Sequence, residues 1–226
     1  QENSSLESVD RMLENSQVQE AYEVLSKMER TCDVEWRLAS AIYSLSLNIE
    51  DGNERMDKLI EGFELAKSAF EKDPKSANAA KRAALLVGFL SECAPTTHEQ
   101  MKYGAQFKKY LDHSIELEPE LSFMVRFMRG RFSFTVASLS WLERAIASKV
   151  FDYLPTCTYD DALKDLLAYE KFAPTITTLL FIGKTYLGKG DKDKAREYLK
   201  RAIECQGESV IDEENIEEAK KILADL

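Results

Sequence analysis

The sequence predicts an all-α fold, a stack of helical hairpins built around one long central helix. Only 9 of the 226 residues are Gly and 5 are Pro, while 44% are hydrophobic, which favours long helices over a turn-rich β fold. No stretch alternates apolar and polar residues with period two for long. Residues 121–151 carry apolar side chains at helical spacing on almost every face and contain no proline. We therefore expect one helical domain over residues 1–226, with a central helix at about 121–151 buried on most sides.

The segments before this central helix show one-sided helical patterns separated by residues that stop helices. The expected helices include residues 6–13, 18–28, 36–43, 55–72, 83–90 and 101–115. Turn chemistry at Gly52 and the prolines Pro74 and Pro119 separate them. Ser76 or Asn78 at one site, and Thr96 or Thr97 at another, are of the residue types that cap helix N-termini, so we expect helices to begin there.

Beyond the central helix, the last hairpin has the spacing of a tetratricopeptide repeat. The matching residues are Leu179, Ile182, Gly183, Tyr186, Ala195, Leu199 and Ala202. Small residues at these positions let two helix backbones approach closely. Residues 36–43 match the first helix of the same repeat. We expect a tetratricopeptide-like solenoid of helical hairpins.

Helix boundaries in the second half follow the same logic. A helix at 159–172 should end before Pro174, and a closing helix at about 213–226 should cap the stack. The distances between the stops at Pro74, Pro119 and Pro174 exceed the standard period of about 34 residues, so the repeats should be irregular.

The charge balance excludes several classes of protein. A formal net charge of -10 argues against a general nucleic-acid or anionic-membrane binder. The four cysteines have neither zinc-site nor redox-motif spacing, which is typical of reduced thiols.

The longest apolar run, residues 83–90, is too short to cross a bilayer, and the polar N-terminus does not resemble a signal peptide. We expect a cytoplasmic protein without a membrane span.

Catalytic chemistry is not indicated. His98 and His113 are the only histidines, and neither belongs to a metal-binding motif. No phosphate-binding glycine loop, dinucleotide fingerprint or nucleophile elbow occurs. We expect no enzyme activity, no cofactor and no metal.

Clustered basic residues are the main candidates for partner binding. Arg126, Arg129 and Arg131 crowd the start of the central segment, and Lys81 and Arg82 lie on an earlier helix. The guanidinium fork suits carboxylates and phosphates, so an anion-recognising patch is the functional interpretation of these residues. Pairing with carboxylates of the protein itself is the alternative and the simpler interpretation.

Several stretches resemble the regulator of microtubule dynamics family. They are WRLA at 36–39, RGRF at 129–132, ASLSWLE at 137–143, PTCTY at 155–159 and LFIGKTYL at 180–187. The likeness covers most of the chain, and the central stretches are specific because a generic tetratricopeptide repeat lacks them. The short length and lack of an anchor make the chain similar to the soluble nematode member of that family.

This resemblance implies a tetratricopeptide-like domain that associates with microtubules and acts in spindle organisation and chromosome segregation. It implies tubulin and mitotic proteins as partners, and localisation to the cytoskeleton, the spindle and the spindle pole. Because tubulin is also acidic, we expect the binding to be weak, salt-sensitive or assisted by another protein.

Phospholipid binding is the alternative function, because some relatives hold a phospholipid in the helical domain. In that case Phe127, Phe134 and Trp141 would line an apolar tunnel, and the nearby arginines would hold the head group. An ordinary filled core is the simpler account of these aromatic residues.

Overall fold

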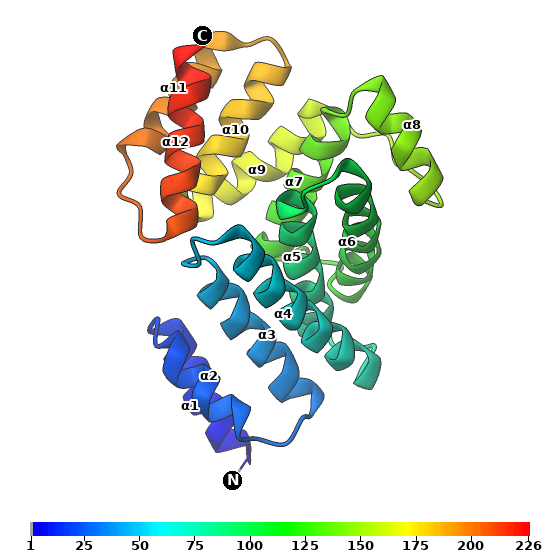
Figure 1. The fold of residues 1–226 in the computed structure, drawn as a ribbon, viewed down its shortest axis with the longest axis vertical. Helices are drawn as coiled ribbons and strands as arrows, with labels where there is room; N and C mark the ends of the chain where they lie inside the picture. The colour runs from blue at the N-terminus through cyan, green and yellow to red at the C-terminus, as the bar shows by residue number, and fades with distance from the viewer. Residues whose placement is uncertain (1) are drawn as a thin grey trace. The chain divides into compact units, whose positions relative to one another are not determined.

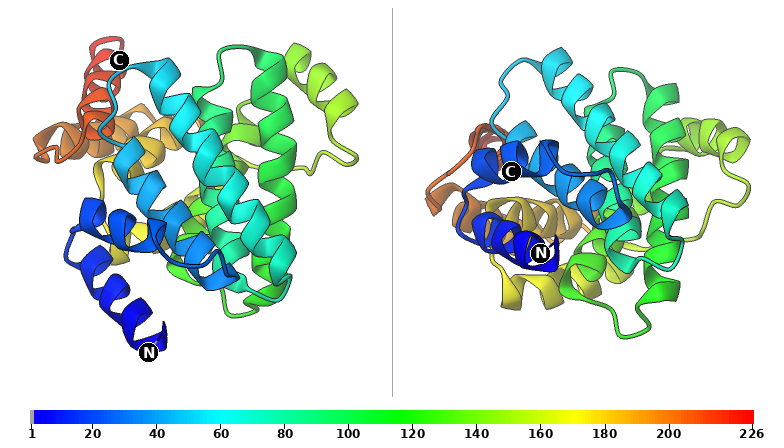
Figure 2. Two further views of the ribbon diagram at one scale, coloured as in Figure 1. Left: turned by 60° about the horizontal axis from the view of Figure 1, so that its bottom comes forward. Right: turned by 90° about the horizontal axis from the view of Figure 1, so that it is seen from below.

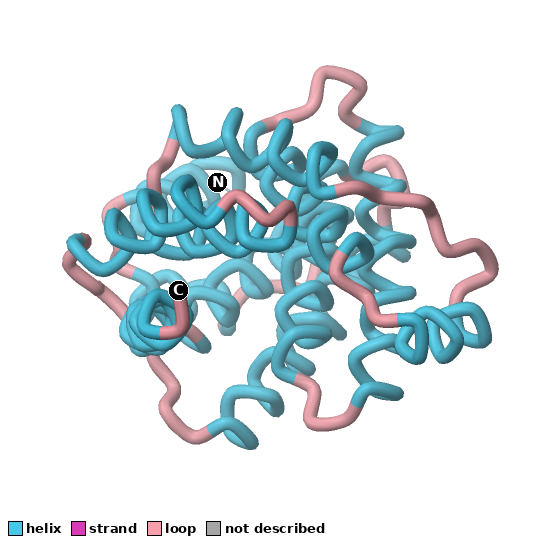
Figure 3. Tube along the Cα trace, turned by 90° about the horizontal axis from the view of Figure 1, so that it is seen from above, coloured by secondary structure: helices cyan, strands magenta, loops and turns pink. Residues whose placement is uncertain are grey.

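The computed structural model describes the backbone of residues 2–226 and the side chains from Ser5 onward. Residues 2–226 form twelve α-helices joined by loops, with no strand among them (Figure 3). This confirms the predicted all-α class. The helices are α1 (Glu2–Glu14), α2 (Val18–Ser26), α3 (Cys32–Ser46), α4 (Gly52–Lys72), α5 (Ala77–Cys93), α6 (Thr97–Leu117), α7 (Phe123–Ala137), α8 (Trp141–Val150), α9 (Tyr159–Phe172), α10 (Ile176–Gly188), α11 (Lys192–Glu204) and α12 (Val210–Ala224).

The chain divides into two compact units, which are described separately. Unit 1 (Gln1–Leu117) contains α1 to α6, and unit 2 (Glu118–Leu226) contains α7 to α12. The single domain expected from the sequence stays a prediction.

Unit 1 is built from consecutive antiparallel hairpins. Helix α3 packs against α4, α4 against α5 and α5 against α6, while α3 also contacts α5 (Figure 1). Local sequence sets the boundaries: of the two candidate caps, Ser76 accepts a hydrogen bond from the Ala79 backbone N–H and caps α5. Helices α4 and α6 end before Pro74 and Pro119. The core contains fully buried side chains such as Leu38, Leu59 and Leu86.

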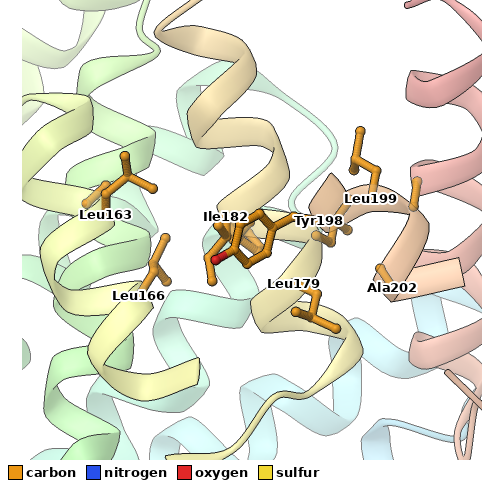
Figure 4. Packing of buried hydrophobic residues seen from close by; sticks show 11 residues of the cluster. Leu163, Leu166, Leu179, Ile182, Tyr198, Leu199 and Ala202 are labelled. Atoms are coloured by element: carbon orange, nitrogen blue, oxygen red, sulfur yellow. The ribbon is translucent and has the colours of Figure 1, made fainter. Parts of the chain in front are cut away.

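A hydrophobic core of unit 2 is formed by residues of α9, α10, α11 and α12. Leu163, Leu166, Leu179, Ile182 and Leu199 contribute to this core, with ring and methyl packing from Tyr198 and Ala202 (Figure 4). Helix α12 packs on α10 and α11, so the closing helix predicted at 213–226 exists and begins at Val210.

A close helix approach in this core depends on Gly183. A Cβ atom built at Gly183 would lie 2.8 Å from Cγ of Leu199, closer than such atoms normally come. The packing of α10 against α11 therefore requires a small residue at position 183, as the repeat spacing predicted.

The predicted continuous helix over 121–151 is wrong, because the structure contains two helices there. Helix α7 ends at Ala137, and α8 begins at Trp141. The Ser140 hydroxyl accepts a hydrogen bond from the Glu143 N–H (3.2 Å), and the Glu143 carboxylate accepts one from the Ser140 N–H (2.7 Å). These two bonds form a capping box, which starts a new helix. The backbone hydrogen bond from Ser140 also lowers the pKa of Glu143.

The prediction that residues 121–151 are buried on most sides is wrong for the second half of the segment, helix α8. Within α8, which the structure describes in full, Ala147 is the one buried residue, and the Trp141 side chain is 82% exposed. Both views of Figure 2 show α8 extending away from the other helices of unit 2, with the loop through residues 151–158 leading back to α9. Burial on several faces therefore applies to α7 alone.

Candidate functional site

Arg129 forms an ion pair with the buried Asp165 and so joins two helices of unit 2. Its Nε and Nη2 atoms donate hydrogen bonds to the two carboxylate oxygens of Asp165, at 2.6 and 2.9 Å. Asp165 is 3% exposed, and its hydrogen bonds raise the pKa of Arg129. The fork geometry is the strong, bidentate form of this interaction. Arg129 thus pairs with a carboxylate of the protein itself, which was the alternative to the anion-recognising patch.

Arg131 lies against aromatic rings in unit 2. Its guanidinium carbon is 4.5 Å from the ring centroid of Phe181 and 5.2 Å from that of Phe127. Lys184 is on the adjacent α10, with Nζ 5.2 Å from the Phe181 ring centroid and 5.5 Å from that of Phe134. Two cations therefore pack on three rings in a half-buried cluster of cationic and aromatic side chains.

Arg126 differs from these two arginines. Its Nε atom donates a long hydrogen bond of 3.4 Å to the Leu121 carbonyl, and the side chain is partly exposed. The three arginines of α7 therefore have three different environments. Of these, Arg126 has the weakest contact to the fold.

Lys81 and Arg82 lie in unit 1, on α5. The Arg82 Nε atom donates a hydrogen bond to the Ser40 hydroxyl of α3, and its guanidinium carbon is 5.3 Å from the Trp36 ring centroid. Lys81 is next to it in the sequence and is partly exposed. The five predicted basic residues divide between the two units. A single surface that contains all five therefore stays a prediction.

A second cation, Arg37, accompanies Arg82 in unit 1 and is not among the predicted site residues. The Arg37 guanidinium carbon is 4.1 Å from the Trp36 ring centroid, and the group forms a fork with the carboxylate of Asp10 on α1. The two hydrogen bonds are 2.7 and 2.9 Å long. The pKa of Asp10 is lowered by the hydrogen bond and charge of Arg37, and also by the charge of Arg82. The two arginines therefore act on one carboxylate.

The predicted aromatic residues separate into two groups. Phe127 packs against Tyr169 with ring centroids 4.6 Å apart, and Phe134 packs edge to face on Phe181 at 5.5 Å. Both rings thus contact other side chains of unit 2. Trp141 does not join them, because it lies exposed on α8.

Residues Arg37 and Lys184 were not predicted as part of a site. Each directly follows a residue of the repeat pattern, Trp36 or Gly183, so the repeat spacing accounts for its position without a binding role. An arginine next to a tryptophan on a repeat helix is the one local signal for Arg37. Its Asp10 partner is 27 positions away, and spacing alone does not indicate such a pair.

The described part of the chain contains no group of three His, Cys, Asp or Glu side chains placed to hold a metal ion. None of its helices combines the length and the apolar character that crossing a membrane requires.

Comparison with known proteins identifies the family. Residues 5–226 match the family described as regulator of microtubule dynamics protein 1-3. The chain belongs to the regulator of microtubule dynamics family. The resemblance predicted from the stretches at 129–132, 137–143 and 180–187 is therefore confirmed.

Relatives within the family differ in how much of their length the chain covers. Regulator of microtubule dynamics protein 1 of Caenorhabditis elegans is 37% identical over 219 residues, which is 95% of this chain and 96% of that protein. Protein 2 of Bos taurus is 29% identical over 240 residues, covering all of this chain but 57% of the relative. Protein 3 of Rattus norvegicus is 32% identical over 174 residues, covering 76% of this chain and 36% of the relative. The chain thus spans nearly all of the nematode protein and about half or less of these mammalian ones.

A solved structure supports the fold of this family member. The crystal structure of a thermophilic tetratricopeptide protein from Thermus thermophilus aligns with a TM-score of 0.57 and 14% sequence identity. The alignment covers 98% of this chain and all of the other. The predicted tetratricopeptide-like, helical-repeat fold is confirmed, and at this level of identity the likeness concerns the fold alone.

Proposed function

We propose that this chain is a microtubule-associated interaction scaffold that acts in spindle organisation and chromosome segregation. Family membership carries the proposal, since the relatives are named for the regulation of microtubule dynamics. Helical-repeat folds bind partners through extended surfaces rather than through reactive sites, which agrees with a scaffold and not an enzyme. Localisation to the cytoplasm, the cytoskeleton, the spindle and the spindle pole belongs to the same proposal, as do mitotic protein partners.

Electrostatics sets the expected character of binding. A net charge of -10 opposes approach to acidic tubulin, so contact has to use locally basic positions. All five predicted basic residues are partly exposed. Arg82 and Arg131 pack on aromatic rings and Arg129 is tied to the buried Asp165, so we take Lys81 in unit 1 and Arg126 in unit 2 as the candidates. Exposed charges are screened by salt, and binding should therefore weaken as the ionic strength rises.

Cosedimentation with microtubules polymerised from purified tubulin tests this proposal. The chain should pellet with microtubules at low salt and less at physiological salt. The K81E and R126E variants should each bind severalfold more weakly than the wild type. K200E is the matched control, because Lys200 is an exposed lysine of α11 outside the predicted patch and its reversal changes the net charge equally. No pelleting at low salt excludes direct binding, and an equal loss in K200E removes the predicted patch from the proposal.

Phospholipid binding by unit 2 is the second proposed function. It is supported by one observation, the packing of Arg131 and Lys184 on the rings of Phe127, Phe134 and Phe181. Mass spectrometry of lipids that copurify with the chain tests it. A preparation free of phospholipid excludes this function and leaves the microtubule proposal unaffected.

A further inference from the structure

Three helices of unit 1 bring charged side chains together around one tryptophan. Trp36 of α3 is 8% exposed, and its Nε1–H donates a 3.1 Å hydrogen bond to Asp33, so the ring is held in place. The guanidinium groups of Arg37 and Arg82 both lie over this ring, at 4.1 and 5.3 Å from its centroid. Stacking on an aromatic face orients guanidinium groups and fixes the direction of their N–H donors. Trp36 is therefore a rigid platform for two cations.

The Asp10 carboxylate is the ligand of Arg37 and is affected by the charge of Arg82. Arg37 holds both of its oxygens, and Arg82 is close enough to lower its pKa. The other carboxylate near Arg37 belongs to Asp33, with Oδ1 3.6 Å from Nη1, and that oxygen already accepts the Trp36 hydrogen bond. Of these two carboxylates, Asp10 is the one held in the bidentate fork that guanidinium groups use to recognise carboxylates.

The Arg37–Asp10 contact is intramolecular, but it has the geometry with which a guanidinium group binds the carboxylate of a separate ligand. Asp10 comes from α1, whereas Arg37 and Arg82 come from the repeat helices α3 and α5. Arg37 is 12% exposed, but the Asp10 side chain is 38% exposed, so the carboxylate occupies the open side of the group. A desolvated guanidinium that loses its carboxylate needs another anion in its place.

We propose that Arg37, Trp36 and Arg82 form a binding site for an acidic side chain of a peptide partner, and that Asp10 fills this site when no partner is bound. Charge and geometry select the occupant: a single carboxylate of the peptide fits the Arg37 fork and lies in the positive field of Arg82. Binding requires the Asp10 side chain to turn away, while α1 stays anchored by its buried Leu6 and Val9. The inference is independent of the proposed function, because peptide binding and microtubule cosedimentation are separate measurements.

Neutralising Asp10 tests the inference directly. The D10N variant of the whole chain should bind a fluorescein-labelled, glutamate-rich peptide about tenfold more tightly than the wild type, which is the size expected for one charge-assisted hydrogen-bonded contact. D193N is the matched control, because Asp193 lies in unit 2, is 98% exposed and carries the same charge. D193N should bind as the wild type does. Adding R37Q to D10N should remove the gain.

Trp36 provides a second readout at the site itself. The chain has two tryptophans, and replacing the exposed Trp141 in a W141F background leaves Trp36 as the sole reporter. Its fluorescence should change as the peptide binds D10N. Equal gains in D10N and D193N, or no gain in D10N, overturn the inference.

Two further outcomes complete the test. Inorganic phosphate that blocks D10N as effectively as the peptide would make this a general anion site and overturn the assignment to a peptide. Folding is checked by circular dichroism, and D10S serves as a second neutral variant. If both variants unfold, Asp10 is a structural residue and the inference is wrong.

Discussion

Replacing Arg129 should destabilise unit 2 far more than replacing its neighbour Arg126. The R129M variant keeps the apolar stem but leaves the Asp165 carboxylate buried and without its two hydrogen bonds. Removing one partner of a buried ion pair costs about 3–5 kcal/mol. Because the Arg129 side chain is 33% exposed, water can reach part of the site, and we expect a loss of about 3 kcal/mol. For a chain of this length, that lowers the melting temperature by roughly 6–12 °C.

Urea unfolding followed by circular dichroism measures this loss, and two further variants isolate its cause. R126M should stay within about 0.5 kcal/mol of the wild type, since Arg126 makes one long hydrogen bond to the backbone. In R129M/D165N the buried group is a neutral amide, which costs about 1–3 kcal/mol when unsatisfied, so about half of the stability should return. A R129M variant as stable as R126M, or a double variant less stable than R129M, would refute the reasoning.

Two other substitutions test local packing and capping. G183A should lose about 1–3 kcal/mol in urea unfolding, because its Cβ would lie 2.8 Å from Leu199 Cγ, whereas G52A has open space around the new methyl group and should be neutral. Equal stability of the two variants would contradict the close approach of α10 and α11. S140A removes the hydroxyl that caps α8 and should weaken that helix by about 1 kcal/mol, seen as faster amide hydrogen exchange in α8 than in α9. Unchanged exchange in α8 would count against the capping box as the cause of the helix start.

Where most helices begin and end could be predicted from local sequence. Pro74, Pro119 and Pro174 lie just beyond helix ends, and Ser76 accepts the expected capping bond. These features act over one helical turn, so the residues that cause them are neighbours in the sequence. The break between α7 and α8 also has a local sequence signal, the Ser-x-x-Glu pattern from Ser140 to Glu143. Apolar spacing continues through this pattern, and for that reason periodicity alone indicated one long helix.

The sequence by itself determined the all-α class, the helical-hairpin repeat and the family resemblance, because these depend on spacing within single segments. Tertiary structure alone decided which cations are tied to the fold. Arg129 pairs with Asp165, which lies 36 positions later in the sequence. Arg37 pairs with Asp10, which lies 27 positions earlier. Neither distance corresponds to neighbours on one helix, since each pair forms only when separate helices pack together. A charged residue therefore becomes a structural ion pair or a binding group according to what the packing places opposite it.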